Sequence, residues 1–198
     1  GNEEFYMIDG QKVVYEAALK YAFLAQKEKR KKVFIIKGGP GTGKSVVAVK
    51  LLAELISRGQ SCEYISKTSA PRNVYLAKLK GVKGKLNIKG LFKGSGSYVD
   101  YPKDSLDTAI VDEAHRLSEK SGMFNNKGEN QIKEIIDAAK CSIFFIDERQ
   151  RVHINDKGSV EEIKKWARNA DAKIYLAELV SQFRCNGSDG YLAWLDYV

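Results

Sequence analysis

The sequence is poor in cysteine and histidine. Its 198 residues include only three cysteines, Cys62, Cys141 and Cys185, and two histidines, His115 and His153. The cysteines are odd in number and widely spaced, so they suggest no disulfide framework, and none has zinc-site spacing to a histidine. We therefore expect core or surface thiols in a cytoplasmic protein.

Long apolar runs are also absent. No stretch approaches the roughly 20 apolar residues of a membrane-spanning helix, and no secretory signal opens the chain. Apolar residues still make up 43% of the sequence, which is enough for a core. The length fits one domain with at most the start of another, and no internal repeat is visible. We expect a cytoplasmic protein with no membrane partner.

Acidic residues are nearly missing from residues 67–103. The whole chain carries 33 Lys and Arg against 25 Asp and Glu, a net charge of +8. This segment has a single acid, Asp100, and nine basic residues, so it holds the entire excess: Lys67, Arg72, Lys78, Lys80, Lys83, Lys85, Lys89, Lys93 and Lys103. Such a segment favours a nucleic-acid partner, and a solvated lysine-rich loop is the alternative. Its glycines predict an irregular, mobile basic insertion over 67–104.

What the chain does contain is a glycine-rich loop at residues 38–45, which fits the pattern G-x-x-x-x-G-K-[ST] without a mismatch. A β-branched run at 32–36 predicts a strand before it, and apolar spacing predicts a helix over 45–57 after it. In this setting, backbone N–H groups surround phosphate, Lys44 reaches the β- and γ-phosphates, and the Ser45 hydroxyl binds Mg²⁺. The predicted nucleotide-binding residues are Gly39, Pro40, Gly41, Thr42, Gly43, Lys44 and Ser45.

A second feature is an acidic pair that follows a predicted strand at 108–111. Asp112 and Glu113 would stand at the carboxyl edge of the sheet, where ligands of open α/β sheets bind. We expect Asp112 to bind Mg²⁺ through water. We expect Glu113 to orient or deprotonate the attacking water.

The remaining periodicities predict strands at 62–66, 141–146 and 173–176 and helices at 12–26, 131–139, 159–169 and 187–198. Together these predict an α/β fold of the P-loop NTPase type, with a mainly parallel sheet and helices on both faces. Asp9 is a candidate cap of the first helix. Gln11, just ahead of that helix, is a candidate reader of the adenine edge, and a surface glutamine is the alternative. The polar turn at 68–73 is either a phosphate grip or a plain turn.

These features together resemble the first RecA-like domain of superfamily 1 DNA/RNA helicases, and more narrowly the bacterial Schlafen-group helicase-like family. The resemblance rests on the glycine loop and on four further stretches: Ser69-Ala70-Pro71-Arg72-Asn73, Asp112-Glu113-Ala114-His115-Arg116-Leu117, Phe144-Phe145-Ile146-Asp147-Glu148-Arg149-Gln150 and Ser181-Gln182-Phe183-Arg184. It implies that Gln11 reads adenine, that Gln150 senses the γ-phosphate, and that Arg184 reaches the γ-phosphate. It also implies nucleic-acid contacts at the 68–73 turn, with Ser69 and Arg72 as candidates beside Lys83, Lys85 and Lys89.

The sequence departs from this family pattern in places. In the stretch Phe144–Gln150, which resembles the third helicase motif, Ile146 precedes Asp147 at the position where that motif usually has glycine. The letters at 112–115 are those of a superfamily 2 box, but the Ser/Thr-Ala-Thr motif of that superfamily does not follow. We expect residues 1–180 to form the first RecA-like domain and residues 181–198 to begin a truncated second one.

The predicted function is Mg²⁺-dependent ATP hydrolysis by the first motor domain of a helicase or translocase acting on single-stranded DNA or RNA. Because a superfamily 1 site is shared between two RecA-like domains, the activity of this chain alone should be weak. The alternative is a P-loop ATPase that switches a partner or a fused nuclease without unwinding. A domain that only binds nucleotide is a further rival, against which the intact Lys44, Asp112, Glu113 and Gln150 argue.

Overall fold

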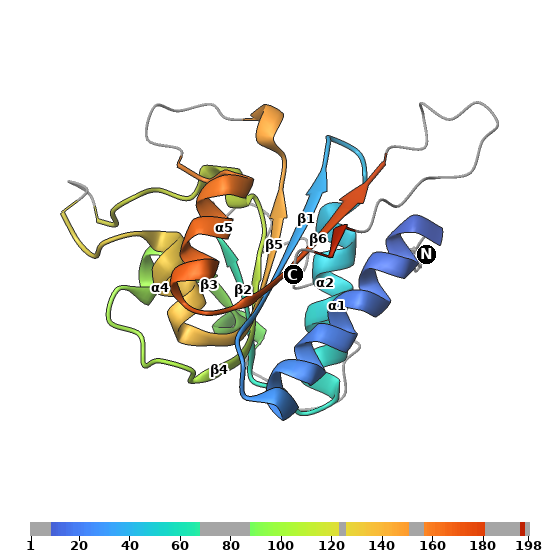
Figure 1. The fold of residues 1–198 in the computed structure, drawn as a ribbon, viewed down its shortest axis with the longest axis horizontal. Helices are drawn as coiled ribbons and strands as arrows, with labels where there is room; N and C mark the ends of the chain where they lie inside the picture. The colour runs from blue at the N-terminus through green and yellow to red at the C-terminus, as the bar shows by residue number, and fades with distance from the viewer. Residues whose placement is uncertain (1–8, 68–87, 123–125, 151–156, 181–194, 197–198) are drawn as a thin grey trace.

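The computed structural model describes residues 9–67, 88–122, 126–150, 157–180 and 195–196. Their centre is a seven-stranded sheet of order β3-β2-β4-β5-β1-β6-β7, parallel except where β7 pairs with β6 (Figure 1). The strands are β1 (Lys32–Gly38), β2 (Cys62–Ser66), β3 (Phe92–Gly94), β4 (Leu106–Val111), β5 (Ala139–Ile146), β6 (Lys173–Leu179) and β7 (Leu195–Asp196).

Helices cover both faces of the sheet. Helices α1 (Asp9–Glu28) and α2 (Lys44–Ser57) lie on one side, and α4 (Gln131–Ala138) and α5 (Val160–Asn169) lie on the other (Figure 1). Short 3₁₀ turns are η1 (Ile88–Leu91), η2 (Ser95–Tyr98), η3 (Ala114–Arg116) and η4 (Glu148–Gln150). The predicted fold class, a P-loop α/β fold with a mainly parallel sheet between two helical layers, is confirmed.

Strand β1 shows why the sheet lies between two cores. Phe34 and Ile36 pack into the cluster beneath α1 and α2, whereas Val33 and Ile35 pack into the cluster beneath α4 and α5. Successive side chains of a strand point to opposite faces, so a strand that is apolar at every position is buried on both sides. This local pattern explains why the run at 32–36 takes a central position.

The strands predicted at 32–36, 62–66, 108–111, 141–146 and 173–176 and the helices predicted at 12–26, 45–57, 131–139 and 159–169 are confirmed with small shifts of their ends. Strands β1, β4, β5 and β6 are each two or three residues longer than predicted. Helix α2 ends at Ser57, and Gly59 takes the expected left-handed conformation with φ of 84°, in which the Gly59 and Gln60 N–H groups donate to the carbonyls of Ile56 and Leu55. Asp9 lies within the first turn of α1 and does not precede it, and a negative charge in the first turn of a helix is favourable.

Two expectations about irregular segments need correction. Part of the predicted basic insertion belongs to the sheet, because Phe92–Gly94 forms the parallel edge strand β3 beside β2. The buried Phe92 and Tyr98 supply apolar surface that holds this part against the core. The helix predicted over 187–198 is wrong at Leu195–Asp196, which pairs antiparallel with the exposed edge of β6. The two-domain boundary at 180 stays a prediction.

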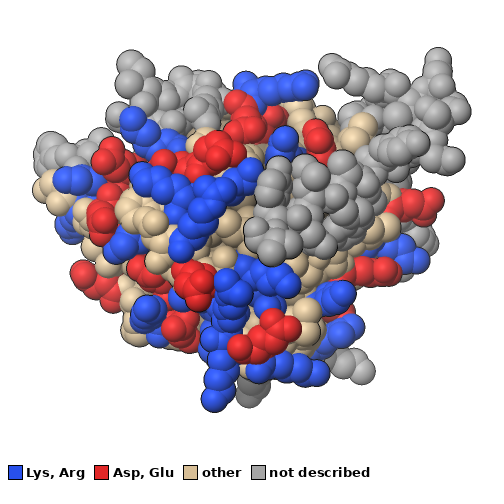
Figure 2. Space-filling view, viewed as in Figure 1, with Lys and Arg blue, Asp and Glu red and all other residues tan. Residues whose placement is uncertain are grey.

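Acidic and basic side chains alternate over the face of the molecule seen in Figure 2. Ion pairs on the described surface join Lys164 with Glu161 and Lys165 with Glu162, both on α5, and neutralise much of the local charge. This mixture agrees with the near-zero net charge of the sequence outside residues 67–103. None of the helices that the structure describes has the length and apolarity needed to cross a membrane.

Candidate functional site

The glycine loop joins β1 to α2 and wraps around the first turn of the helix. Gly41 and Gly43 have φ angles of 72° and 81°, a left-handed backbone conformation that residues other than glycine rarely adopt. The Thr42 hydroxyl donates to the Gly39 carbonyl at 2.8 Å and ties the loop across its own turn. The loop therefore ends at the amino terminus of a 14-residue helix, a position that favours bound anions.

Lys44 lies at the mouth of this loop. Its ammonium group donates to the carbonyl oxygens of Gly38 and Gly39, each at 2.7 Å. Burial lowers the pKa of Lys44, and the nearby carboxylates of Asp147 and Asp112 partly oppose that shift. The lysine is thus a half-buried donor held within reach of any phosphate in the loop.

Ser45 and Asp112 meet across the gap between α2 and the carboxyl end of β4. The Ser45 hydroxyl donates to Oδ2 of Asp112 at 2.9 Å, and Oδ1 of Asp112 accepts the N–H of Glu113 at 2.9 Å. Both groups are hard oxygen donors, which Mg²⁺ prefers, and Mg²⁺ typically takes few protein ligands beside phosphate and water. The pair therefore fits a Mg²⁺ ion shared between protein and nucleotide.

Glu113 follows Asp112 in a left-handed conformation, with φ of 51°. Such a φ is uncommon for a residue other than glycine and often marks a functional turn. The turn leaves the Glu113 side chain about one-third exposed, with one carboxylate oxygen 3.9 Å from the Arg116 guanidinium. Glu113 is therefore accessible to water at the sheet edge while Asp112 beside it is buried.

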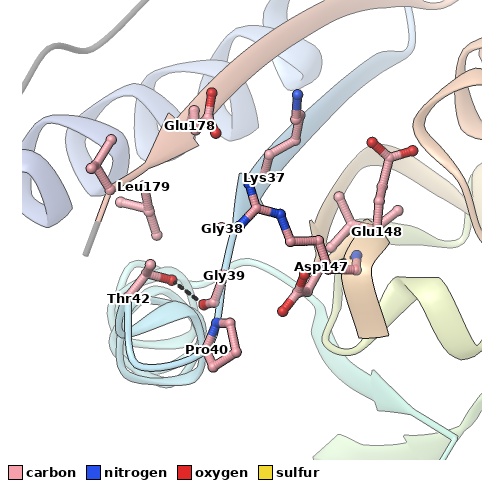
Figure 3. Close-up of a pocket in the computed structure, with 12 residues that line it drawn as sticks. Lys37, Gly38, Gly39, Pro40, Thr42, Asp147, Glu148, Glu178 and Leu179 are labelled. Carbon is pink, nitrogen blue, oxygen red and sulfur yellow. Dashed lines mark hydrogen bonds between the residues drawn. The ribbon is translucent and has the colours of Figure 1, made fainter. Parts of the chain in front are cut away.

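A cavity of about 460 Å³ opens beside the glycine loop. Figure 3 shows the loop between the end of β5, which carries Asp147 and Glu148, and the end of β6, which carries Glu178 and Leu179. The crossovers bring these strand ends together because β1 lies between β5 and β6 in the sheet. The cavity thus lies where parallel strands of an open sheet present their carboxyl ends.

Gln11 reaches the same loop from the first turns of α1. Its side-chain nitrogen donates to the Thr42 carbonyl at 3.0 Å. A β-carbon added to Gly43 would lie only 2.1 Å from this nitrogen, so the glutamine packs directly on the loop. Gln11 is thus partly buried against the loop, and adenine recognition by Gln11 stays a prediction.

Three side chains at the site had no assigned role in the sequence. Tyr64 on β2 donates its hydroxyl to Asp112. His115 is buried, and its Nδ1 accepts the backbone N–H of Asp147 at 3.2 Å. Asp147 is itself buried, and its Oδ2 has no hydrogen-bond partner among the described residues. Tyr64 gave a weak signal, since a buried tyrosine normally needs a partner for its hydroxyl.

The other predicted residues are placed less completely. Gln150 is exposed in η4, directly after the β5 end that lines the cavity. Lys89 lies in η1, near the start of the described stretch 88–122. The remaining candidates, Ser69, Arg72, Lys83, Lys85 and Arg184, lie outside the described residues. Their roles stay predictions.

The sequence comparison agrees with this arrangement. A family model described as the Schlafen group 3 DNA/RNA helicase domain matches residues 31–198, which include the glycine loop, Asp112 and Gln150. The chain belongs to this family. The predicted resemblance to Schlafen-group helicase-like proteins is therefore confirmed.

Individual relatives are more distant. The uncharacterized protein YPL245W of Saccharomyces cerevisiae is 27% identical over 186 residues, which cover 84% of this chain and 41% of that protein. The chain therefore spans less than half the length of this relative.

Among solved structures, one match is the flagellar accessory protein FlaH of Methanocaldococcus jannaschii. The match covers 85% of this chain and 79% of the FlaH chain, with 17% sequence identity and a TM-score of 0.45. Bacteroides Pif1 bound to single-stranded DNA matches 93% of this chain and 44% of its own at 11% identity and a TM-score of 0.45.

Proposed function

We propose that this chain is the ATP-hydrolysing first motor domain of a superfamily 1 helicase or translocase that acts on DNA or RNA. The observation that carries the proposal is the 2.9 Å contact between the Ser45 hydroxyl and Asp112, which joins the phosphate loop to the end of β4. Membership of the helicase-domain family supports it.

The positions of the side chains support the following proposed roles. Lys44 and the loop N–H groups bind the nucleotide phosphates, and Ser45 and Asp112 hold Mg²⁺ directly or through water. When bound, Mg²⁺ neutralises charge on the phosphate oxygens. Glu113, which is accessible to water, orients the attacking water and accepts its proton.

Three further residues complete the proposed nucleotide site. Gln11 recognises adenine, and Gln150 senses the γ-phosphate from the end of β5. Arg184 supplies a cation to the transferred phosphoryl group, a contribution worth about 10³–10⁵ in rate in other NTPases. We propose that a second RecA-like domain completes the site and brings these residues into register.

Nucleic acid is proposed to bind along the basic segment at 67–103, including Ser69 and Arg72 and the lysines Lys83, Lys85 and Lys89. The only acid in this segment is Asp100, so the local field favours a polyanion. Lys67, at its start, donates to Ser118 at 2.8 Å. This hydrogen bond ties the basic segment to the loop that follows Glu113.

The direct test measures nucleotide binding and ATP turnover of the full-length protein, with and without single-stranded DNA or RNA at low salt. Glu113→Gln should retain nucleotide binding and lose about 10²–10⁴ in turnover, because the positioned base is gone. Glu119→Gln, an exposed neighbour, is the matched control and should be unchanged.

Two results would contradict parts of the proposal. Unchanged turnover in Glu113→Gln would remove Glu113 from the catalytic role. Turnover that no nucleic acid stimulates would instead favour the alternative function, a P-loop ATPase that switches a partner or a fused nuclease.

A further inference from the structure

Tyr64 occupies the middle of β2 and is almost completely buried, with 1% of its surface exposed. Its ring packs against Phe92 of the edge strand β3, with ring centroids 5.2 Å apart. Its hydroxyl donates to Oδ2 of Asp112 at the end of β4. The ring of Tyr64 thus packs in the core on the α1 and α2 side of the sheet, and its hydroxyl contacts the carboxylate that is proposed to hold Mg²⁺.

The Asp112 carboxylate is fixed from three directions. Its Oδ2 accepts the hydroxyls of both Tyr64 and Ser45, and its Oδ1 accepts the Glu113 N–H. Ser45 and Asp112 are both proposed to face Mg²⁺, and the Glu113 N–H belongs to the adjoining peptide. Tyr64 is therefore a side-chain contact of Asp112 that has no assigned role of its own in metal or phosphate binding.

We infer that Tyr64 is a positioning residue of the Mg²⁺ site, whose hydroxyl holds Asp112 with Oδ2 turned toward Ser45. This inference rests on the proposed function, because it concerns the metal that accompanies the nucleotide. Hydrogen-bond partners of metal-binding carboxylates keep the ligand oriented, and their loss commonly weakens metal binding about 10–100-fold.

The chain offers a matched control, Tyr98 in η2, whose hydrogen-bond partner Glu63 lies on the same strand as Tyr64. Tyr98 is also 1% exposed, and its hydroxyl donates to the carboxylate of Glu63, the residue before Tyr64, at 2.5 Å. Tyr98 packs in the cluster beneath α4 and α5, whereas Tyr64 packs in the cluster beneath α1 and α2. Removal of either hydroxyl thus deletes a tyrosine–carboxylate hydrogen bond that involves a residue of β2, and only the hydrogen bond of Tyr64 involves Asp112.

The experiment measures binding of a fluorescent, non-hydrolysable ATP analogue to the full-length protein, first in EDTA and then across a Mg²⁺ titration. Tyr64→Phe should raise the half-saturating Mg²⁺ concentration at least about tenfold and leave the affinity in EDTA unchanged. Tyr98→Phe should match the wild type in both measurements. A Mn²⁺ titration followed by electron paramagnetic resonance should give the same ranking without any turnover.

A double-mutant cycle with Asp112→Asn separates positioning from a general loss of stability. If the Tyr64 hydroxyl acts through Asp112, adding Tyr64→Phe to Asp112→Asn should change the Mg²⁺ midpoint no further. Additive effects, or a midpoint in Tyr64→Phe equal to that of the wild type, would overturn the inference. So would an equal loss of nucleotide affinity in EDTA, which indicates only a packing role.

Failure of the proposed function gives a different result. In that case the wild-type protein itself would bind the analogue no more tightly with Mg²⁺ than in EDTA. A wild-type protein with clear Mg²⁺ dependence and an unaffected Tyr64→Phe variant would reject only the role of Tyr64.

Discussion

The Nδ1 atom of His115 lies 3.2 Å from the backbone nitrogen of Asp147 and accepts its hydrogen bond. The contact joins the loop after β4 to the end of β5, the two strand ends that carry the acids of the site. An acceptor at Nδ1 requires that this nitrogen carry no proton. Burial lowers the pKa of His115, which favours the same neutral form, although Glu113 and Asp147 oppose the shift.

This geometry predicts a pH-dependent stability. Because the His115 pKa is lower in the folded protein than in the unfolded chain, protonation favours unfolding. The contribution of His115 to the free energy of unfolding should be fully present above about pH 6.5. It should be lost as the pH falls from there through the folded-state pKa of His115. His115→Asn keeps an acceptor near the Nδ1 position and removes the titration. Its stability should therefore fall less than that of the wild type between pH 7 and 5, as measured by urea unfolding.

Equal losses of stability for the wild type and His115→Asn over that pH range would show that His115 does not titrate as described. Glu28 and Asp107 have pKa values lowered by lysine neighbours, so their contributions are lost at more acidic pH. They should act alike in both proteins.

A side chain at Gly43 should be destabilising, mainly because of the positive φ at this residue. Gly43→Ala places a β-carbon at φ of 81° and 2.1 Å from the Gln11 nitrogen. The left-handed backbone alone costs about 1–2 kcal/mol for a residue other than glycine. We expect a free energy of unfolding at least that much lower, together with weaker nucleotide binding, as measured by chemical denaturation and analogue titration.

Gly10 is the matched control for Gly43, because a β-carbon there meets no atom within 4 Å. Gly10→Ala should leave stability unchanged or raise it by up to about 1 kcal/mol. A Gly43→Ala protein as stable as Gly10→Ala would mean that the loop relaxes easily and that its geometry is not constrained by Gln11.

Asp147 should support the charge of Lys44. Its carboxylate raises the Lys44 pKa against the opposing effect of burial, so Asp147→Asn should lower that pKa further. Nucleotide affinity depends on protonated Lys44 and should be lost as the pH rises through the Lys44 pKa. The loss should therefore begin at a lower pH in Asp147→Asn than in the wild type, in analogue titrations between pH 7 and 10.

The control is Asp171→Asn, which alters an exposed aspartate that forms an ion pair with Arg30. It should follow the wild-type profile. Superimposable profiles for Asp147→Asn and Asp171→Asn would show that Asp147 does not influence Lys44.

The basic segment should contribute electrostatically to nucleic-acid affinity. Reversing the charge of Lys83, Lys85 and Lys89 should weaken binding and flatten the dependence of log K on log salt. The slope should change by about 0.7 for each single-strand phosphate that these lysines no longer neutralise. Fluorescence anisotropy with a labelled single strand at several salt concentrations measures both quantities.

Reversal of three exposed lysines outside the segment, Lys20, Lys27 and Lys157, provides a control with the same change in net charge. An equal effect in both triple variants would indicate a response to total charge alone. An unchanged salt slope in the first variant would mean that these lysines do not contact the nucleic acid.

The sequence alone determined the local features of this protein. The glycine pattern at 38–45 dictates a turn that requires positive φ, and continuous apolarity at 32–36 dictates a strand buried on both faces. The position of Asp112 followed as well, because a polar pair directly after a buried strand must lie at the sheet edge. Each of these conclusions depends on neighbours within a few residues.

Only the tertiary structure decided which strand ends meet. The order β4-β5-β1-β6 brings Asp112, Asp147 and Lys44 to one edge, and crossovers through helices set that order, which periodicity does not encode. The contacts of Tyr64 with Asp112 and of His115 with Asp147 join residues 48 and 32 positions apart. Strand β3 was not predicted because a run of three residues is too short to show an alternating pattern. These residues form a strand because they pair with β2, a contact between distant parts of the sequence.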